Sequence, residues 1–183
     1  MTDGLMTRSR RWRDAVAMYC DRRQLVILLM GFASGLPLLL GFSTLSYWLA
    51  KDGISLPKIG GMLAVSTPYA VKFLWAPVLD QVAPPGPFRG LGRRRGWLLA
   101  IQLLLAVAIA ALGCGDPKQG LVYVAATAFA VAFLSASQDI VIDAYRIEIL
   151  APSEQGAGAA MTDKGYRIAL LAAGAGALAL ADF

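Results

Sequence analysis

The stretch LVYVAATAFAVAFL (121–134) runs directly into SASQDIVIDAYRIE (135–148). The first part is apolar and is typical of a helix inside a lipid bilayer. The second part carries an amide, two carboxylates and an arginine close together, at Gln138, Asp139, Asp143 and Arg146. Charged groups in a membrane are costly and usually face a polar cavity or pair with one another. The stretch therefore predicts a membrane helix whose polar side chains either face a polar cavity or pair with one another.

The composition of the whole chain agrees with a membrane protein. The chain has 183 residues, of which 57% are hydrophobic and only 16% are charged, and its mean hydropathy is +0.59. Soluble domains are about 25% charged. The charges also cluster in short tracts between apolar runs. We therefore predict an all-α polytopic membrane protein.

Five apolar runs approach or exceed the roughly 20 residues that span a bilayer. The first is too long for a signal peptide, so we interpret it as a retained helix. Aromatic residues such as Trp75 and Trp97 lie near span ends, as membrane interfaces favour. Residues 1–24 form a basic tail, and residues 25–183 hold the predicted spans, at about 25–49, 59–79, 97–113, 121–142 and 157–181.

The distribution of basic residues orients these spans. Thirteen Lys and Arg lie in the tail, in the second and fourth loops and at the start of the fifth span, against three in the first and third loops. Cytoplasmic loops carry the excess of positive charge. We therefore expect a cytoplasmic N-terminus. The net charge of +5 has the same explanation, and no nucleic-acid partner is expected.

Several functional classes find no support. The chain has no His, which excludes His-based catalysis and His metal ligands. Its cysteines, Cys20 and Cys114, form no CxxC pair. The glycines of LLAAGAGALALA (170–181) form no nucleotide loop, and this surface suits close helix packing instead. No catalytic residue, metal or cofactor is expected.

Helix-disrupting residues occur in the first two spans. GFASGLP (31–37) lies in the first, and Pro68 and Pro77 lie in the second. Proline inside a helix removes a hydrogen bond and kinks the helix. Transporters use bent or broken helices near the membrane midplane, although Gly and Pro are common in membrane helices generally.

Candidate site residues fall into a deep group and a rim group. Lys72 lies within the second span, about 10 Å from its cytoplasmic end, and either snorkels, pairs structurally or lines a substrate cavity. Asp139 and Asp143 share a helix face that Gln138 borders. We expect Gln138 and Asp139 to face a cavity or to couple protons. Asp143, Arg146 and Glu148 lie nearer the cytoplasm. They either take part in function or form an ion network that locks the helices together.

The second loop offers one more candidate. Asp80 closes the second span and GRRRGW (92–97) opens the third. Asp80 either pairs with these arginines or with a helix from elsewhere, or else the arginines serve only to set the topology.

Four of these motifs occur together in a known family. YAVKFLWAPVLD (69–80), GRRRGWLLAIQLLL (92–105), SASQDIVIDAYRIEIL (135–150) and EQGAGAAMTDKGYRIALL (154–171) follow one another in order. With them the chain resembles the AmpG-type muropeptide permeases of the major facilitator superfamily, from about residue 23 to its end. The resemblance implies import of anhydromuropeptides across the bacterial inner membrane for cell-wall recycling, with protons as the coupling partner.

Polar groups on one face of otherwise apolar helices also suggest roles for individual residues in the intact protein. The substrate and proton pathway would comprise Tyr69, Lys72, Gln138 and Asp139. A cytoplasmic gate network would comprise Asp80, Arg93, Arg94, Arg95, Asp143, Arg146 and Arg167.

The length of the chain departs from the family. Members of the family have two halves with substrate between them, and five spans are fewer than one half. We expect an incomplete N-terminal half of a major facilitator fold, whose C-terminal half is a separate partner or is lost. The alternatives are a related acetyl-CoA-type transporter, a non-transporting membrane remnant or assembly subunit, and a membrane-embedded enzyme that uses Asp139 and Asp143 as acid and base.

Overall fold

The computed structural model describes residues 19, 21–118 and 120–181. Throughout this part the chain forms helices, turns and loops and no strand, which confirms the all-α class. Three of its helices are long and apolar enough to cross a membrane, namely α2 (Arg22–Leu39), α7 (Arg93–Gly113) and α8 (Leu121–Ile149). Most of the predicted basic tail, together with Cys20, lies outside the described residues.

The first predicted span is one nearly continuous helical segment. Helix α2 passes through a π-helical turn (Leu40–Thr44) into α3 (Leu45–Lys51). Pro37 lies inside α2, three residues before that turn begins. The helix is not interrupted at Gly31 or Gly35, so these glycines need a different explanation from the helix breaking that the sequence suggested.

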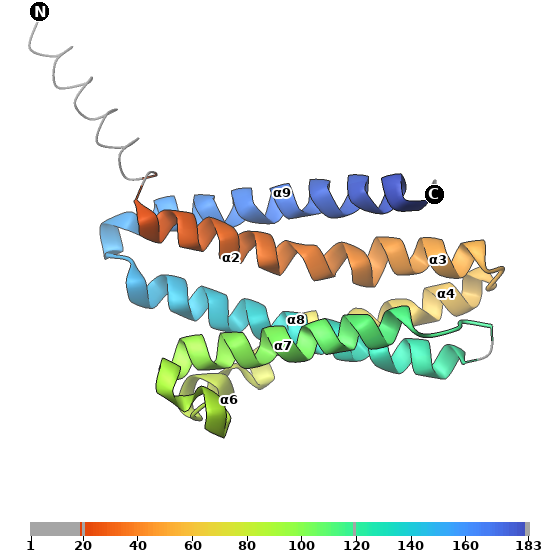
Figure 1. The fold of residues 1–183 in the computed structure, drawn as a ribbon, viewed down its shortest axis with the longest axis horizontal. Helices are drawn as coiled ribbons and strands as arrows, with labels where there is room; N and C mark the ends of the chain where they lie inside the picture. Colours follow the sequence, from red (N-terminus) through yellow and green to blue (C-terminus); the bar gives the residue numbers. More distant parts are fainter. Residues whose placement is uncertain (1–18, 20, 119, 182–183) are drawn as a thin grey trace, which may run out of the picture.

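Gly31 and Gly35 allow close packing between α2 and α9 (Gln155–Ala181), which run side by side (Figure 1). A Cβ atom at Gly35 would lie 2.7 Å from the Tyr166 carbonyl oxygen, and one at Gly165 would meet the Leu28 carbonyl oxygen. The glycines let the two backbones approach. This tight contact lies at Gly165 and not in LLAAGAGALALA, where Gly176 has no neighbour within 4 Å of its Cβ position.

The second predicted span is a chain of short helical pieces. They are α4 (Leu56–Met62), a 3₁₀ turn (Leu63–Ser66), α5 (Thr67–Val71), a 3₁₀ turn (Lys72–Leu74) and α6 (Ala76–Gln81). Pro68 and Pro77 lie in the first turns of α5 and α6, where the missing N–H costs nothing. Lys72 therefore lies at a junction between helical pieces.

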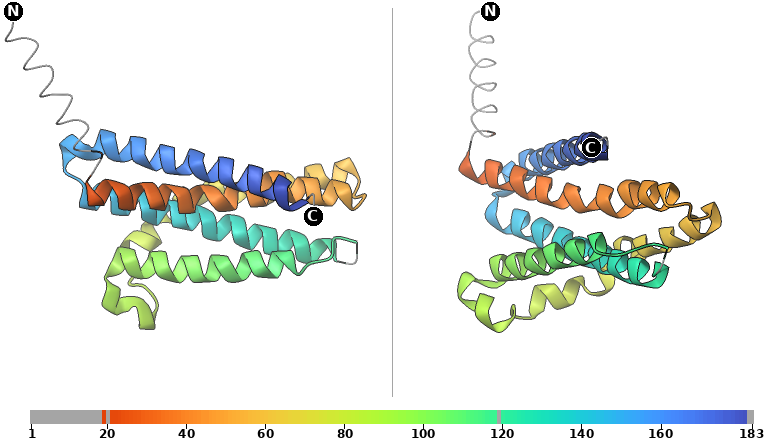
Figure 2. Two further views of the ribbon diagram at one scale, coloured as in Figure 1. Left: turned by 45° about the horizontal axis from the view of Figure 1, so that its top comes forward. Right: turned by 45° about the vertical axis from the view of Figure 1, so that its right-hand side comes forward.

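Helices α7 and α8 form an antiparallel pair, and α8 contacts α2, α5, α6, α7 and α9 (Figures 1 and 2). Buried Leu105, Val124 and Val131 pack with Leu45 and Leu49 of α3. Helix α8 continues seven residues beyond the predicted end of its span, to Ile149. Its central position makes α8 the element that brings polar residues from the other helices together.

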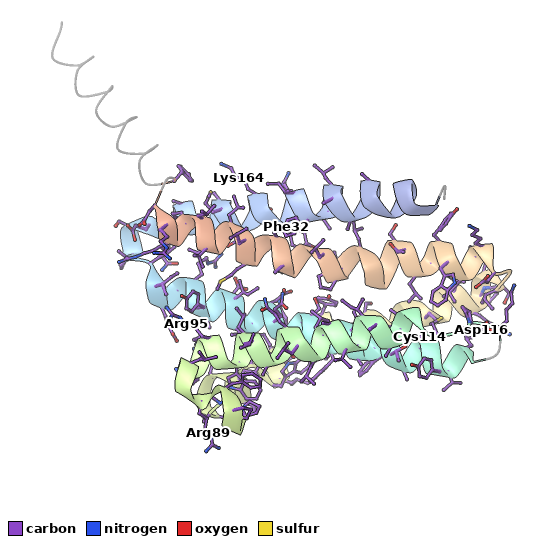
Figure 3. All side chains as sticks on the ribbon, in the orientation of Figure 1. Phe32, Arg89, Arg95, Cys114, Asp116 and Lys164 are labelled. Atoms are coloured by element: carbon purple, nitrogen blue, oxygen red, sulfur yellow. The ribbon has the colours of Figure 1, made fainter. Side chains whose placement is uncertain are left out.

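The loop after α6 is packed onto the start of α7. The Trp97 indole donates a hydrogen bond to the Val82 carbonyl at 2.9 Å. A Cβ atom at Gly96 would lie 2.6 Å from the Phe88 carbonyl oxygen, so only glycine admits the 3₁₀ turn (Gly86–Leu91) so closely. This packing fixes the arginines of GRRRGW at one end of the bundle, opposite Cys114 and Asp116 (Figure 3).

Candidate functional site

Asp139, on α8, is the centre of a polar cluster formed by three segments. One carboxylate oxygen accepts a hydrogen bond from the Ser34 hydroxyl of α2 at 2.5 Å. The other lies 3.8 Å from the Lys72 ammonium, and these two side chains are 20% and 37% exposed. The Lys72 side chain thus reaches toward α8 from a break in the second segment. This geometry favours an ion pair over simple snorkelling.

Further polar groups of α8 lie on this face or beside it. Ser135 and Gln138 are almost fully buried. Tyr69 of α5 interacts with Ser135 and lies within electrostatic range of Asp139 and Tyr166. The Gln138 amide nitrogen is buried and has no hydrogen-bond partner among the described residues. The four predicted pathway residues therefore lie in one region, with an N–H group left over for an added partner.

An aromatic pair borders this cluster. The Trp75 indole donates to the Ser137 hydroxyl at 3.0 Å, and Ser137 donates to the Phe133 carbonyl at 2.7 Å. The rings of Trp75 and Phe133 lie 4.8 Å apart between centroids. Sequence reasoning placed Trp75 at a membrane interface and missed this contact. Nothing in the local sequence of the second span indicates which residue of α8 it meets.

The polar cluster is mostly buried, with little free space beside it. The small cavity beside Tyr69 and Pro37 has a volume of about 10 Å³, room for about one water molecule. Lys72 remains partly exposed. The Lys72–Asp139 pair is therefore only partly covered by the described helices.

A second group of charges lies at the end of the bundle where α7 begins. Arg94 bonds Asp80 at 2.6 Å and Glu148 at 2.8 Å, and its side chain is only 11% exposed. Arg93 lies 3.7 Å from the same Glu148 carboxylate. Arg94 thus ties α6, α7 and α8 together. Sequence reasoning named Glu148 at the rim but did not identify it as the partner of Arg94.

The remaining predicted gate residues are not joined to this group. Asp143 and Arg146 pair along α8 at 3.4 Å. Arg167 pairs with Asp163 of its own helix, at 2.9 Å. Arg95 makes no ion pair within the described residues. Arg146 instead extends its aliphatic part along Gly158 of α9, so it joins two helices mainly by packing.

The groups of the polar cluster act by hydrogen bonding and by charge. In residues 19, 21–118 and 120–181, no three His, Cys, Asp or Glu side chains come close enough to share a metal ion. A carboxylate, an ammonium, hydroxyls and a primary amide are suited to bind a proton and a polar organic molecule.

Comparison with known proteins gives the family. The sequence model described as "Acetyl-coenzyme A transporter 1" matches residues 24–129, more than half of the chain. The anhydromuropeptide permease of Escherichia coli (strain K12) is 49% identical over 160 residues, which are 87% of this chain and 32% of that protein. The putative transporter AmpG 1 of Rickettsia felis is 36% identical over 159 residues, 87% of this chain and 36% of its own length.

These relatives are named as permeases and transporters, not as enzymes. An uncharacterized protein of Haemophilus influenzae is also 43% identical, over 87% of this chain and 37% of its own length. The chain thus spans about a third of the length of the curated relatives it matches. It is a multi-pass membrane protein that belongs to the acetyl-coenzyme A transporter family, and the comparisons confirm its resemblance to the AmpG-type permeases within the major facilitator superfamily.

Proposed function

We propose that this chain forms the N-terminal part of a proton-coupled importer of anhydromuropeptides in the bacterial inner membrane. Its N-terminus would lie in the cytoplasm, and the predicted five spans would form one wall of the substrate path. A further set of helices, encoded with it or separately, would form the other wall. The observation that carries the proposal is Asp139, held by Ser34 and Lys72 on the central helix of the bundle.

Asp139 and Lys72 together supply a way to couple a proton to a substrate. A proton that binds Asp139 removes the charge that attracts Lys72. The Lys72 ammonium, 3.8 Å away, is then free to bind a carboxylate of the peptide portion of the substrate. Release of the proton toward the cytoplasm restores the ion pair and expels the substrate carboxylate from Lys72.

Other side chains suit the neutral parts of the same substrate. The buried amide nitrogen of Gln138 has no partner within the described residues and would donate to a substrate carbonyl or hydroxyl. Tyr69 lies on the neighbouring segment and offers a hydroxyl and a flat apolar face, which sugars bind well. A disaccharide linked to a peptide needs this mixture of groups.

The charge group around Arg94 would form part of the cytoplasmic gate. Arg94 joins Asp80 and Glu148 from two other helices, so movement of α6 or α8 must break at least one of its bonds. Asp143 and Arg146 would add a second, separate pair at the same end. Arg95 and Arg167 would enter the gate only in another state of the transporter.

Uptake of labelled anhydromuropeptide tests the proposal. Asp139→Asn, introduced in the intact homologue at the matching position, should lower uptake by about 5- to 150-fold, the usual size of coupling between two binding sites. Asp163→Asn is the matched control, because Asp163 is an exposed aspartate whose ion pair among the described residues is with Arg167 of its own helix. Equal uptake by the two variants, at equal amounts in the membrane, would remove Asp139 from the pathway.

The description of the matching family model favours a second candidate, an acetyl-CoA-type substrate. The same cells distinguish the two candidates. Unlabelled anhydromuropeptide should compete with labelled anhydromuropeptide, and acetyl-CoA at the same concentration should not. Competition by acetyl-CoA alone would favour the second candidate.

A further inference from the structure

An arginine-lined cavity of about 440 Å³ lies at the end of the bundle where α2 and α7 begin and α8 ends. Arg22 and Arg23 line it from α2, Arg95 from α7 and Tyr145 from α8, and Asp21 is the one acidic residue among the described residues that line it. We call it the arginine pocket. It shares no lining residue with the polar cluster around Asp139, and of its residues only Arg95 has a part in the proposed transport cycle, as a gate residue of another state.

The arginine pocket carries unsatisfied positive charge. Arg22 and Arg95 make no ion pair within the described residues, and Arg23 donates only a long hydrogen bond, 3.5 Å, to the Ile149 carbonyl. The Asp21 carboxylate accepts a hydrogen bond from the Arg23 backbone N–H at 3.2 Å. Because it carries a single negative charge, it neutralises at most one of the three arginines. By contrast, the neighbouring Arg94 is bonded to two carboxylates. The pocket therefore attracts an anion from outside the described residues.

The depth of the arginine pocket indicates which anion. Arg22 and Arg23 precede the predicted first span by two or three residues, Arg95 precedes the third by two, and Tyr145 follows the fourth by three. At about 1.5 Å per residue these positions lie roughly 3–5 Å beyond the hydrocarbon. The headgroup layer on each side is roughly 5–8 Å thick. The predicted span boundaries thus put the pocket at the level of lipid phosphates.

We propose that the arginine pocket binds the phosphate of an anionic phospholipid of the cytoplasmic leaflet. The arginine guanidinium groups would bond the phosphate oxygens in bidentate fashion, and the Tyr145 hydroxyl would donate to the same group or to the headgroup glycerol. Anionic lipids are held in this way by basic pockets between membrane helices. The segment before residue 19 is a poor alternative occupant, because its four arginines exceed its two aspartates.

Native mass spectrometry of the detergent-solubilised full chain measures this binding, with phosphatidylglycerol as the probe and phosphatidylcholine as the neutral comparison. Arg95→Gln should weaken phosphatidylglycerol binding about fivefold, the usual contribution of one arginine near an anionic membrane surface. Arg167→Gln is the matched control, because it removes the same charge from an arginine that bonds only Asp163; its binding should not change.

Asp21→Asn should change phosphatidylglycerol binding in the opposite direction to Arg95→Gln. A misfolded variant would not bind the lipid more strongly. Loss of the one acidic lining residue should strengthen phosphatidylglycerol binding. Inorganic phosphate at millimolar concentration should not displace the lipid, and displacement would instead assign the pocket to free phosphate. Equal binding by the wild type, Arg95→Gln and Asp21→Asn would overturn the proposal, as would equal binding of phosphatidylcholine.

Discussion

At the scale of single residues, the environment of a charged side chain depends on its position in the bundle and not on the sequence around it. Arg93, Arg94 and Arg95 are consecutive but differ in environment. Arg94 is nearly buried between two carboxylates, Arg93 is half exposed with one contact, and Arg95 lines the arginine pocket. Sequence reasoning identified the arginine cluster but not this division, because helix rotation and the position of α8 determine it.

The different environments of Arg94 and Arg93 predict that their substitutions lower the stability of the chain by different amounts. Arg94→Gln should lower the free energy of unfolding by about 1.5–3 kcal/mol, since it removes charged hydrogen bonds and leaves Asp80 and Glu148 without their shared cation. Arg93→Gln, the matched control, should cost less than about 1 kcal/mol, as is usual for exposed pairs. Unfolding of the purified chain in mixed detergent measures both. Equal losses would show that the short bonds of Arg94 contribute no more than a surface contact.

At the scale of helices, the apolar runs predict which segments are helical, and tertiary contacts decide how they end and bend. The third, fourth and fifth predicted spans correspond to α7, α8 and α9, and the first corresponds to α2 and α3. The second is broken at Pro68 and Pro77, as its prolines suggested. The glycines of GFASGLP were harder to interpret, because a glycine that breaks a helix and one that packs it closely have the same local sequence.

Close packing of α2 on α9 predicts a difference between two glycines of α9. Gly165→Ala should destabilise the chain by about 1–3 kcal/mol, since the new Cβ meets the backbone of Leu28. Gly176→Ala should be neutral or stabilising by up to about 1 kcal/mol, because its Cβ enters open space and alanine favours helix. The same detergent unfolding measures both. A destabilising Gly176→Ala together with a neutral Gly165→Ala would contradict this packing.

At the scale of the whole molecule, the two ends of the bundle differ in chemistry. Arg89 and Arg95 lie at one end, and Cys114 and Asp116 lie at the other (Figure 3). The excess of basic residues predicts that the arginine end is cytoplasmic. The polar cluster of Asp139 lies between the two ends and was located from the sequence through the cost of charge in lipid. Its partner Ser34 was not identified from the sequence, because an uncharged serine in an apolar helix has no comparable cost in lipid.

The two cysteines test this orientation. Cys114 is a free, exposed thiol beyond the end of α7 and should react with a membrane-impermeant maleimide added to cells with a permeable outer membrane. Cys20, in a variant that carries Cys114→Ser, should react only after the inner membrane is opened. Labelling in the reverse order would place the N-terminus outside.

We propose above that this chain supplies the substrate-facing wall of an anhydromuropeptide importer. The most direct measurement uses a chimera in which the chain replaces the matching 160-residue segment of the Escherichia coli permease, in cells that lack their own permease. We expect the chimera to take up labelled anhydromuropeptide and to lose about 5- to 150-fold of this uptake with Asp139→Asn. A chimera that reaches the membrane in normal amounts but imports nothing, or imports equally well without the Asp139 carboxylate, would contradict the claim.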